Sequence, residues 1–158
     1  ALAGFEGMML NSGGAIYEMS AASSTLERLV IDTFKSYFGF DTGDVIITSG
    51  GTLANLTALI CARNAKATEE IWQEGQNEKY AFMVSEEAHY CIDRAVRVMG
   101  WGDAGIIKVP VDDHYKMKTE FLEPLYQKAT SEGIIVLGVV GSAPTTSTGI
   151  YDNLKQHL

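Results

Sequence analysis

A continuous apolar run at residues 134–140, Ile-Ile-Val-Leu-Gly-Val-Val, constrains the fold more than any other feature of the chain. A strand that is apolar on both faces belongs inside a parallel sheet, because helices must then cover both sides. We therefore predict a central parallel strand at these residues. Helical and strand patterns alternate along the rest of the chain without repeats or a linker. This order predicts an α/β fold, a mostly parallel sheet flanked by helices.

Other elements follow from apolar periodicity and from the residues that begin and end helices. Three further strands are predicted, at residues 45–48, 80–84 and 106–109. Helices are predicted at residues 24–38, from 51 to 63 or beyond, at 88–99 and from 119 or a later start near Pro124, with a surface helix or loop at 66–79. Ser24 and Glu27 have capping-box spacing, and glycines 39, 100 and 133 mark helix ends. One face of the first helix carries Leu26, Leu29, Val30, Phe34, Tyr37 and Phe38.

Residues 48–55, Thr-Ser-Gly-Gly-Thr-Leu-Ala-Asn, join the strand at 45–48 to a helix. The first N–H groups of a helix lack partners and carry partial positive charge, so a phosphate can bind at Gly51 and Thr52. The hydroxyls of Ser49 and Thr52 add donors. A tight turn that only packs the helix on the sheet explains the glycines equally well. No lysine follows them and the spacing is not a dinucleotide fingerprint, so ATP and NAD are not the expected ligands.

Three polar segments follow predicted strands, at residues 49–55, 85–89 and 141–149. The carboxyl ends of parallel strands are where ligands bind in open α/β sheets, so these segments are expected to converge. His89 lies in the second segment, and by itself such a histidine is more often a cap or a packed residue than a catalytic one. His114 and His157 are expected at the surface, and Asp112 with Asp113 in a solvated turn.

Composition excludes several function classes. The net charge is −8 and no basic run occurs, so nucleic acid and anionic membranes are poor partners. Cys61 and Cys91 are far apart and have no second ligand at metal spacing, so neither a disulfide nor a metal site is predicted. Both fit buried or neutral thiols of a reducing, cytoplasmic compartment. No apolar run reaches membrane-spanning length, and both ends look like cuts in a longer sequence.

Together the three polar segments resemble the group II pyridoxal-phosphate-dependent amino acid decarboxylases, which act on glutamate, aromatic amino acids, diaminobutyrate and others. Residues 48–63, from Thr-Ser-Gly-Gly-Thr to Ala-Arg, are similar to the family's hallmark. Residues 85–91, Ser-Glu-Glu-Ala-His-Tyr-Cys, resemble its histidine segment, and residues 140–152 its threonine-rich loop. Residues 17–27 resemble the segment that leads into the family's Leu-Glu helix. The likeness covers most of residues 8–158.

The resemblance implies the large domain of the aspartate-aminotransferase type of fold (fold type I), with residues 1–158 as its N-terminal portion, without the lysine-bearing half. It implies that Gly51 and Thr52 hold the phosphate of pyridoxal 5'-phosphate, that His89 stacks on the pyridine ring, and that Thr146 and Thr145 contact the cofactor. Residues 17–20 then border the substrate pocket, or are plain surface packing. In this family an amino acid forms an imine with the cofactor and loses carbon dioxide.

The chain departs from the family pattern in a few places. Lys155 precedes His157, whereas the family's Schiff-base lysine follows a histidine, and the aspartate that pairs with the pyridine nitrogen has no counterpart. We therefore expect this chain alone to be inactive as a decarboxylase. Leu53 replaces an acidic residue, and Pro144 replaces a glycine in the loop that carries Thr145. Because relatives are dimers with sites at the subunit interface, a homodimer or association with the remaining part of the enzyme is expected.

Two alternatives remain open from the sequence. One is a cysteine desulfurase or aminotransferase-like enzyme of the same fold, whose glycine corner and histidine segment are similar; Ala62-Arg63 and Thr145-Thr146 favour the decarboxylases. The other is a non-catalytic phosphate-binding α/β module. The identity of the amino acid substrate does not follow from these residues.

Overall fold

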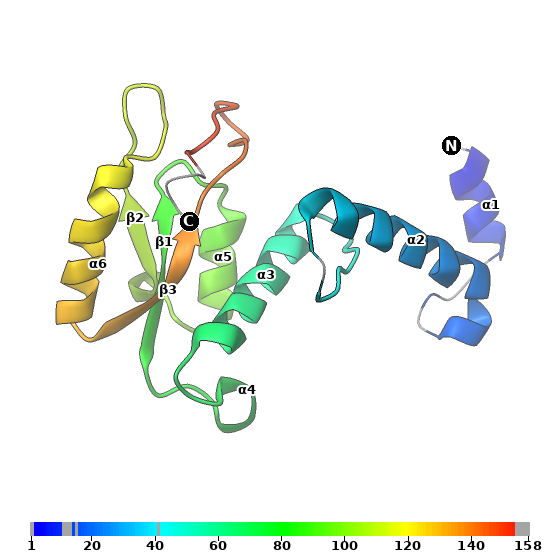
Figure 1. Cartoon of the computed structure of the whole chain (residues 1–158), viewed down its shortest axis with the longest axis horizontal. Helices are drawn as coiled ribbons and strands as arrows, with labels where there is room; N and C mark the ends of the chain where they lie inside the picture. Colours follow the sequence, from blue (N-terminus) through cyan, green and yellow to red (C-terminus); the bar gives the residue numbers. More distant parts are fainter. Residues whose placement is uncertain (1, 11–13, 15, 41, 154–158) are drawn as a thin grey trace. The chain divides into compact units, whose positions relative to one another are not determined.

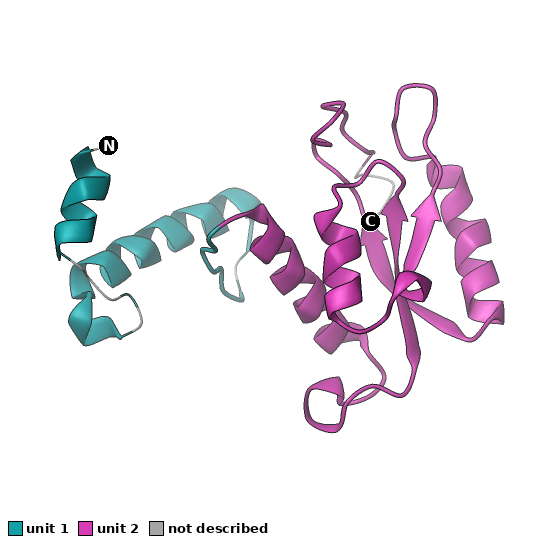
Figure 2. Ribbon diagram, turned by 180° about the vertical axis from the view of Figure 1, so that it is seen from behind, with its two compact units in different colours: residues 1–49 teal, residues 50–158 magenta. Residues whose placement is uncertain are grey.

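The computed structural model describes residues 2–10, 14, 16–40 and 42–153 of the chain. It divides into two compact units, Ala1–Ser49 and Gly50–Leu158, shown in teal and magenta in Figure 2. None of the helices that these described residues form is long and apolar enough to cross a membrane.

The first unit is helical. It contains α1 (Leu2–Leu10), the short 3-10 helix η1 (Tyr17–Met19) and α2 (Ala21–Phe38). The predicted capping box at Ser24 is wrong, because α2 begins earlier, with Ser20 as its N-cap, and the Ser24 N–H donates to the Ser20 carbonyl oxygen. Ala21 and Ala22 have high helix propensity, so α2 extends further toward the N-terminus than predicted. The predicted end is confirmed, since Gly39 caps α2 in the left-handed region with φ 69°.

The apolar face expected on α2 is exposed within its unit. Ile31 is the single buried residue among those described in α2. The six apolar residues of the predicted face, hereafter the α2 apolar face, are all exposed: Leu26, Leu29, Val30, Phe34, Tyr37 and Phe38.

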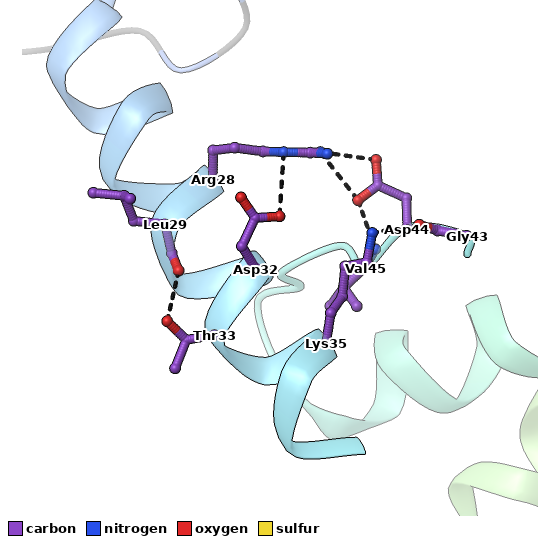
Figure 3. Close-up of polar contacts among 8 residues, drawn as sticks. All are labelled: Arg28, Leu29, Asp32, Thr33, Lys35, Gly43, Asp44 and Val45. Carbon is purple, nitrogen blue, oxygen red and sulfur yellow. Dashed lines mark hydrogen bonds and ion pairs between the residues drawn. The ribbon is translucent and has the colours of Figure 1, made fainter. Parts of the chain in front are cut away.

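A polar cluster ties the segment after α2 back to this helix (Figure 3). The guanidinium of Arg28 donates to both carboxylate oxygens of Asp44, at 3.1 and 3.0 Å, and the ammonium of Lys35 donates to the Gly43 carbonyl oxygen at 2.8 Å. The Val45 N–H also donates to Asp44. This N–H and the Arg28 guanidinium hold the pKa of Asp44 below its ordinary value.

The strand predicted at residues 45–48 is wrong. These residues have no regular secondary structure, and Ile46 and Ile47 are 63% and 57% exposed. A strand exists only where a neighbour accepts and donates its backbone hydrogen bonds. Among the described residues, the sheet consists of three other strands that pair with one another.

The second unit is a three-layer α/β structure (Figure 1). Its elements are α3 (Gly51–Lys66), α4 (Ile71–Glu74), β1 (Lys79–Ser85), α5 (Cys91–Val98), η2 (Asp103–Gly105), β2 (Ile106–Val109), η3 (Thr119–Phe121), α6 (Leu122–Ser131) and β3 (Ile134–Val140). The strands predicted at 80–84, 106–109 and 134–140 are thus confirmed. The predicted helix ends at two glycines are confirmed as well, because Gly100 has a φ of 86° and Gly133 a φ of 72°. Thr119 opens a 3-10 turn, and Pro124 lies in the first turn of α6, where a missing N–H costs little.

All three strands are parallel, in the order β2-β1-β3. The prediction of a central position for β3 is wrong within the described sheet, where β1 is central and β3 is a largely half-buried edge. Successive side chains of β1 point to opposite faces. Tyr80, Phe82 and Val84 pack in one core cluster with α3 and α5, whereas Met83 packs with Val109 and α6 on the other face. The sheet is therefore covered on both faces, as the α/β prediction requires.

Candidate cofactor site

A cavity of about 610 Å³ lies at the carboxyl ends of β1 and β3. Its walls come from the N-terminal turns of α3, the segment between β1 and α5, and the loop after β3. Four of the five residues predicted to contact a cofactor line it: Gly51, Thr52, His89 and Thr146. The predicted convergence of polar segments at this edge is therefore present within the second unit. Ser49, predicted to add a donor, belongs to the first unit.

The first wall is the N-terminus of α3. Gly50 is its N-cap, in extended backbone, and its carbonyl oxygen accepts the N–H groups of Leu53 and Ala54 at 3.1 and 3.0 Å. The N–H groups of Gly51 and Thr52 precede the first intrahelical bond, so they point out of the helix end. A Cβ placed on Gly51 meets no described atom within 4 Å outside its chain neighbours and its own helix backbone, so nothing else in the described chain packs against this Cα. This wall offers two backbone donors, a hydroxyl and the positive end of the helix dipole.

The second wall carries His89, a half-buried ring just before α5. Its Nδ1 accepts the N–H of Cys91 at 3.2 Å. In the neutral ring the proton is therefore on Nε2. The ring also lies against Tyr90, with centroids 4.3 Å apart. These contacts fix the orientation of the imidazole before any ligand binds.

The third wall is the loop at residues 141–152, in which neighbouring threonines have different places. Thr146 lines the cavity, whereas Thr145 is 3% exposed and turned into the loop. The Thr145 hydroxyl bonds to the hydroxyl of Thr148 and accepts the Ile150 N–H at 3.2 Å. The peptide bond between Ala143 and Pro144 is cis.

Eight further lining residues were not among the predicted contacts, and two of these, Asn55 and Cys91, bond to each other. Asn55 lies one helical turn beyond Gly51, and its amide donates to the Cys91 thiol at 3.2 Å. Cys91 is buried and also lines the cavity. The spacing of four from Gly51 to Asn55 places both on one face of a helix, a signal available in the sequence. This contact ties α3 to α5 behind the cavity. Cys61, by contrast, is exposed.

Among the described residues that line the cavity, the ionisable side chains are those of His89 and Cys91. The lining contains no lysine, arginine or carboxylate. An anion placed here would be stabilised by N–H groups, hydroxyls and the dipole of α3, because the lining holds no lysine or arginine.

The family model for the pyridoxal-dependent decarboxylase conserved domain matches residues 2–157. The chain belongs to this family. It is 30% identical over 150 residues to L-aspartate decarboxylase dtxS4 of Metarhizium robertsii, covering 94% of this chain and 30% of that protein. It is 31% identical over 137 residues to aromatic-L-amino-acid decarboxylase of Bacillus atrophaeus, covering 86% and 27%.

Solved structures agree. The crystal structure of mouse CSAD in its apo form superposes with a TM-score of 0.91 at 27% identity, over 98% of this chain and 33% of that one. The fold class inferred from the resemblance, part of the large domain of a pyridoxal-phosphate enzyme, is confirmed, and the desulfurase alternative is not the family found. The chain spans only about 30% of the length of the relatives above.

The family's cofactor is pyridoxal phosphate, and the walls of the cavity fit its parts. A phosphate would fit the N–H groups and hydroxyl that precede the first intrahelical bond of α3, and a flat ring would fit against the oriented imidazole of His89. Lys155, which its motif excludes as the Schiff-base residue, lies outside the described residues.

Proposed function

We propose that this chain is the N-terminal portion of the large domain of a pyridoxal-phosphate-dependent amino acid decarboxylase, and that the cavity holds the cofactor. The observation that carries the proposal is the meeting of Gly51 and Thr52, His89 and Thr146 around one cavity. These residues come from three segments that are distant in the sequence. The carboxyl ends of parallel strands bring these segments to one edge of the sheet, and what supports the proposal is that they present backbone donors, hydroxyls and an imidazole to the same cavity.

In the proposed site, the N–H groups of Gly51 and Thr52 and the Thr52 hydroxyl donate to the phosphate. Such bonds to an anion are short and strong, and the dipole of α3 adds to them. Because Gly51 has no side chain, the anion can approach the backbone closely.

His89 is proposed to lie against the cofactor ring, with the N–H of Cys91 holding Nδ1 and the proton on Nε2. A fixed imidazole defines the plane of the ring. The Thr146 hydroxyl contacts the cofactor from the loop side, and Thr145 supports that contact from within the loop. Ile92 and Val140 contribute apolar side chains to the lining.

When bound, the cofactor would supply an electron sink for the electron pair that stays on the amino acid when carbon dioxide is lost. The task of this chain is to hold the ring in place and keep the site dry. We propose that residues 1–158 alone bind the cofactor without decarboxylating an amino acid, because they do not contain the family's Schiff-base motif. Release of carbon dioxide from an amino acid by the full-length enzyme tests the reaction and excludes a non-catalytic module.

The binding test is a fluorescence titration of the chain with two ligands, pyridoxine 5'-phosphate and pyridoxine. Both carry an alcohol in place of the aldehyde, so neither forms imines with surface lysines. Loss of a hydrogen bond to a charged group costs about 1.5–3 kcal/mol. Thr52→Ala is therefore expected to lower the affinity for pyridoxine 5'-phosphate about 10- to 100-fold. Binding of the ligand without phosphate should not change. His89→Ala should weaken both.

Matched controls are Thr57→Ala and His114→Ala. Thr57 lies on the same helix as Thr52, with its hydroxyl bonded to the Leu53 carbonyl oxygen, and neither control residue lines the cavity. If the wild-type chain binds neither ligand, or if the controls weaken binding as much as Thr52→Ala and His89→Ala, the proposed cofactor site is refuted.

We further propose that the enzyme is a cytoplasmic homodimer, or that this part associates with the rest of the enzyme. Support comes from the exposed α2 apolar face, because contiguous apolar surface of this kind usually meets another polypeptide. The free thiols of Cys61 and Cys91 fit a reducing compartment. Light scattering of the full-length enzyme measures the oligomeric state, and a monomer at micromolar concentration would contradict the dimer.

A further inference from the structure

Asp152 is a buried carboxylate that has no part in the roles proposed above. The residue is 5% exposed. Its Oδ2 accepts the Ser142 N–H at 2.8 Å, and its Oδ1 accepts the Met117 N–H at 2.9 Å. A buried carboxylate is tolerated only when its oxygens accept hydrogen bonds, and bonds from N–H groups to a charged oxygen are strong. The carboxylate therefore bridges two separate stretches of backbone.

One end of the bridge is in the cavity wall. Ser142 lines the cavity, and its main chain bonds to Asp152 twice, because the Asp152 N–H also donates to the Ser142 carbonyl oxygen at 2.9 Å. Within the loop closed by these bonds, the Thr145 N–H donates to the Ile150 carbonyl oxygen. The position of Ser142 thus sets where the wall at residues 141–146 begins.

The other end of the bridge is held by the core. Met117 is 4% exposed and packs in the cluster that contains Met83 and Val109. Its backbone forms an antiparallel bridge with Val111. The N–H that Asp152 receives from Met117 is therefore part of a fixed frame.

We propose that Asp152 is a positioning residue: it ties the cavity wall at residues 141–146 to the core-anchored backbone at Met117 and so places Thr146 at the cavity. The cofactor part of this inference rests on the proposed function. The bridge itself is independent of any ligand.

The first test uses the wild-type chain without ligand. Residue-resolved amide hydrogen exchange by NMR is expected to show slow exchange at Ser142 and Met117, because both N–H groups are bonded to a buried acceptor. Exchange at either amide as fast as at an exposed loop amide would overturn the bridge. This measurement needs no variant, so it decides the matter even if substitutions at Asp152 prevent folding.

The second test compares Asp152→Asn with Asp152→Ala. An asparagine can accept one of the two N–H groups but turns an NH₂ donor toward the other, and alanine accepts neither. Faster exchange at Met117 or Ser142 is expected in the first variant and at both in the second. The affinity for pyridoxine 5'-phosphate should fall about ten-fold with asparagine and further with alanine. Asp113→Asn, an exposed carboxylate in the same turn as Asp112, is the control for the change of charge.

The outcomes separate the two proposals. Faster exchange with unchanged cofactor affinity would make Asp152 a purely structural residue and overturn the positioning role. If the wild-type chain binds no cofactor, the proposed function fails. The inference about the wall is then decided by the NMR shifts of residues 143–146, which must move in Asp152→Asn and stay in place in Asp113→Asn.

Discussion

Replacing His89 by asparagine separates two roles that alanine removes together. The His89 Nδ1 accepts the Cys91 N–H at 3.2 Å, and Cys91 is buried, so loss of the ring leaves an N–H with no acceptor at the start of α5. Loss of such a cap costs about 1 kcal/mol, within the range of 0.5–2 kcal/mol. Asparagine restores the acceptor, because its side-chain oxygen reaches the N–H two residues on, but it offers no ring to a cofactor.

We therefore expect His89→Ala to lose about 1 kcal/mol of unfolding free energy, which for a domain of about 100 residues lowers the melting temperature by about 5 °C. His89→Asn should recover most of this loss and still bind pyridoxine 5'-phosphate as weakly as His89→Ala does. Urea denaturation followed by circular dichroism measures the first quantity, and the fluorescence titration measures the second. An asparagine variant that binds like the wild type would refute the role of the ring. One as unstable as the alanine variant would refute the role of Nδ1.

Two further predictions concern stability. Gly105→Ala places a Cβ 2.6 Å from the Trp101 Cβ and 2.8 Å from the Val96 Cγ1, so urea denaturation should show a loss of about 1–3 kcal/mol from overpacking. Backbone N–H groups lower the pKa of both Glu69 and Asp112. Their stabilising contribution is therefore complete above the ordinary carboxyl pKa of about 4 and is lost as the pH falls through the lower folded values. Carboxyl titration by NMR should find both groups below their ordinary values, and unshifted titrations would contradict the bonds.

Local patterns predicted most of the second unit. The strand at residues 106–109 was predicted at its observed limits, and the glycines at 100 and 133 end their elements with positive φ. These features depend on side-chain periodicity and on the conformational freedom of glycine, which are properties of short stretches. The convergence of Thr52, His89 and Thr146 was predictable for another reason, since the carboxyl ends of parallel strands share one edge of a sheet.

Features that depend on distant partners were not predictable. The apolar stretch at 45–48 has strand composition, but a strand also needs a neighbour with free hydrogen bonds, and composition does not provide one. The apolar run of β3 likewise does not determine which strand is central, because that depends on which strands pair with it. Thr145 and Thr146 are identical in type, and only the folded loop turns one hydroxyl inward and the other residue toward the cavity. Asp152 had no signal beyond its place at the end of the threonine-rich segment.

The lining of the proposed site holds no lysine or arginine, so in a chain of net charge −8 a bound anion would depend on N–H groups, hydroxyls and the dipole of α3. Repulsion from distant surface carboxylates is screened within about 8 Å at physiological salt, whereas the N–H groups at the start of α3 act in direct contact. Their orientation then decides the affinity. A hydrogen bond lies behind each wall: Asn55 to Cys91 behind α3, the Cys91 N–H to His89 behind the ring, and Ser142 to Asp152 behind the loop. Because Cys91 takes part in two of these bonds, the first two walls are mechanically coupled, and the third is held separately through Met117.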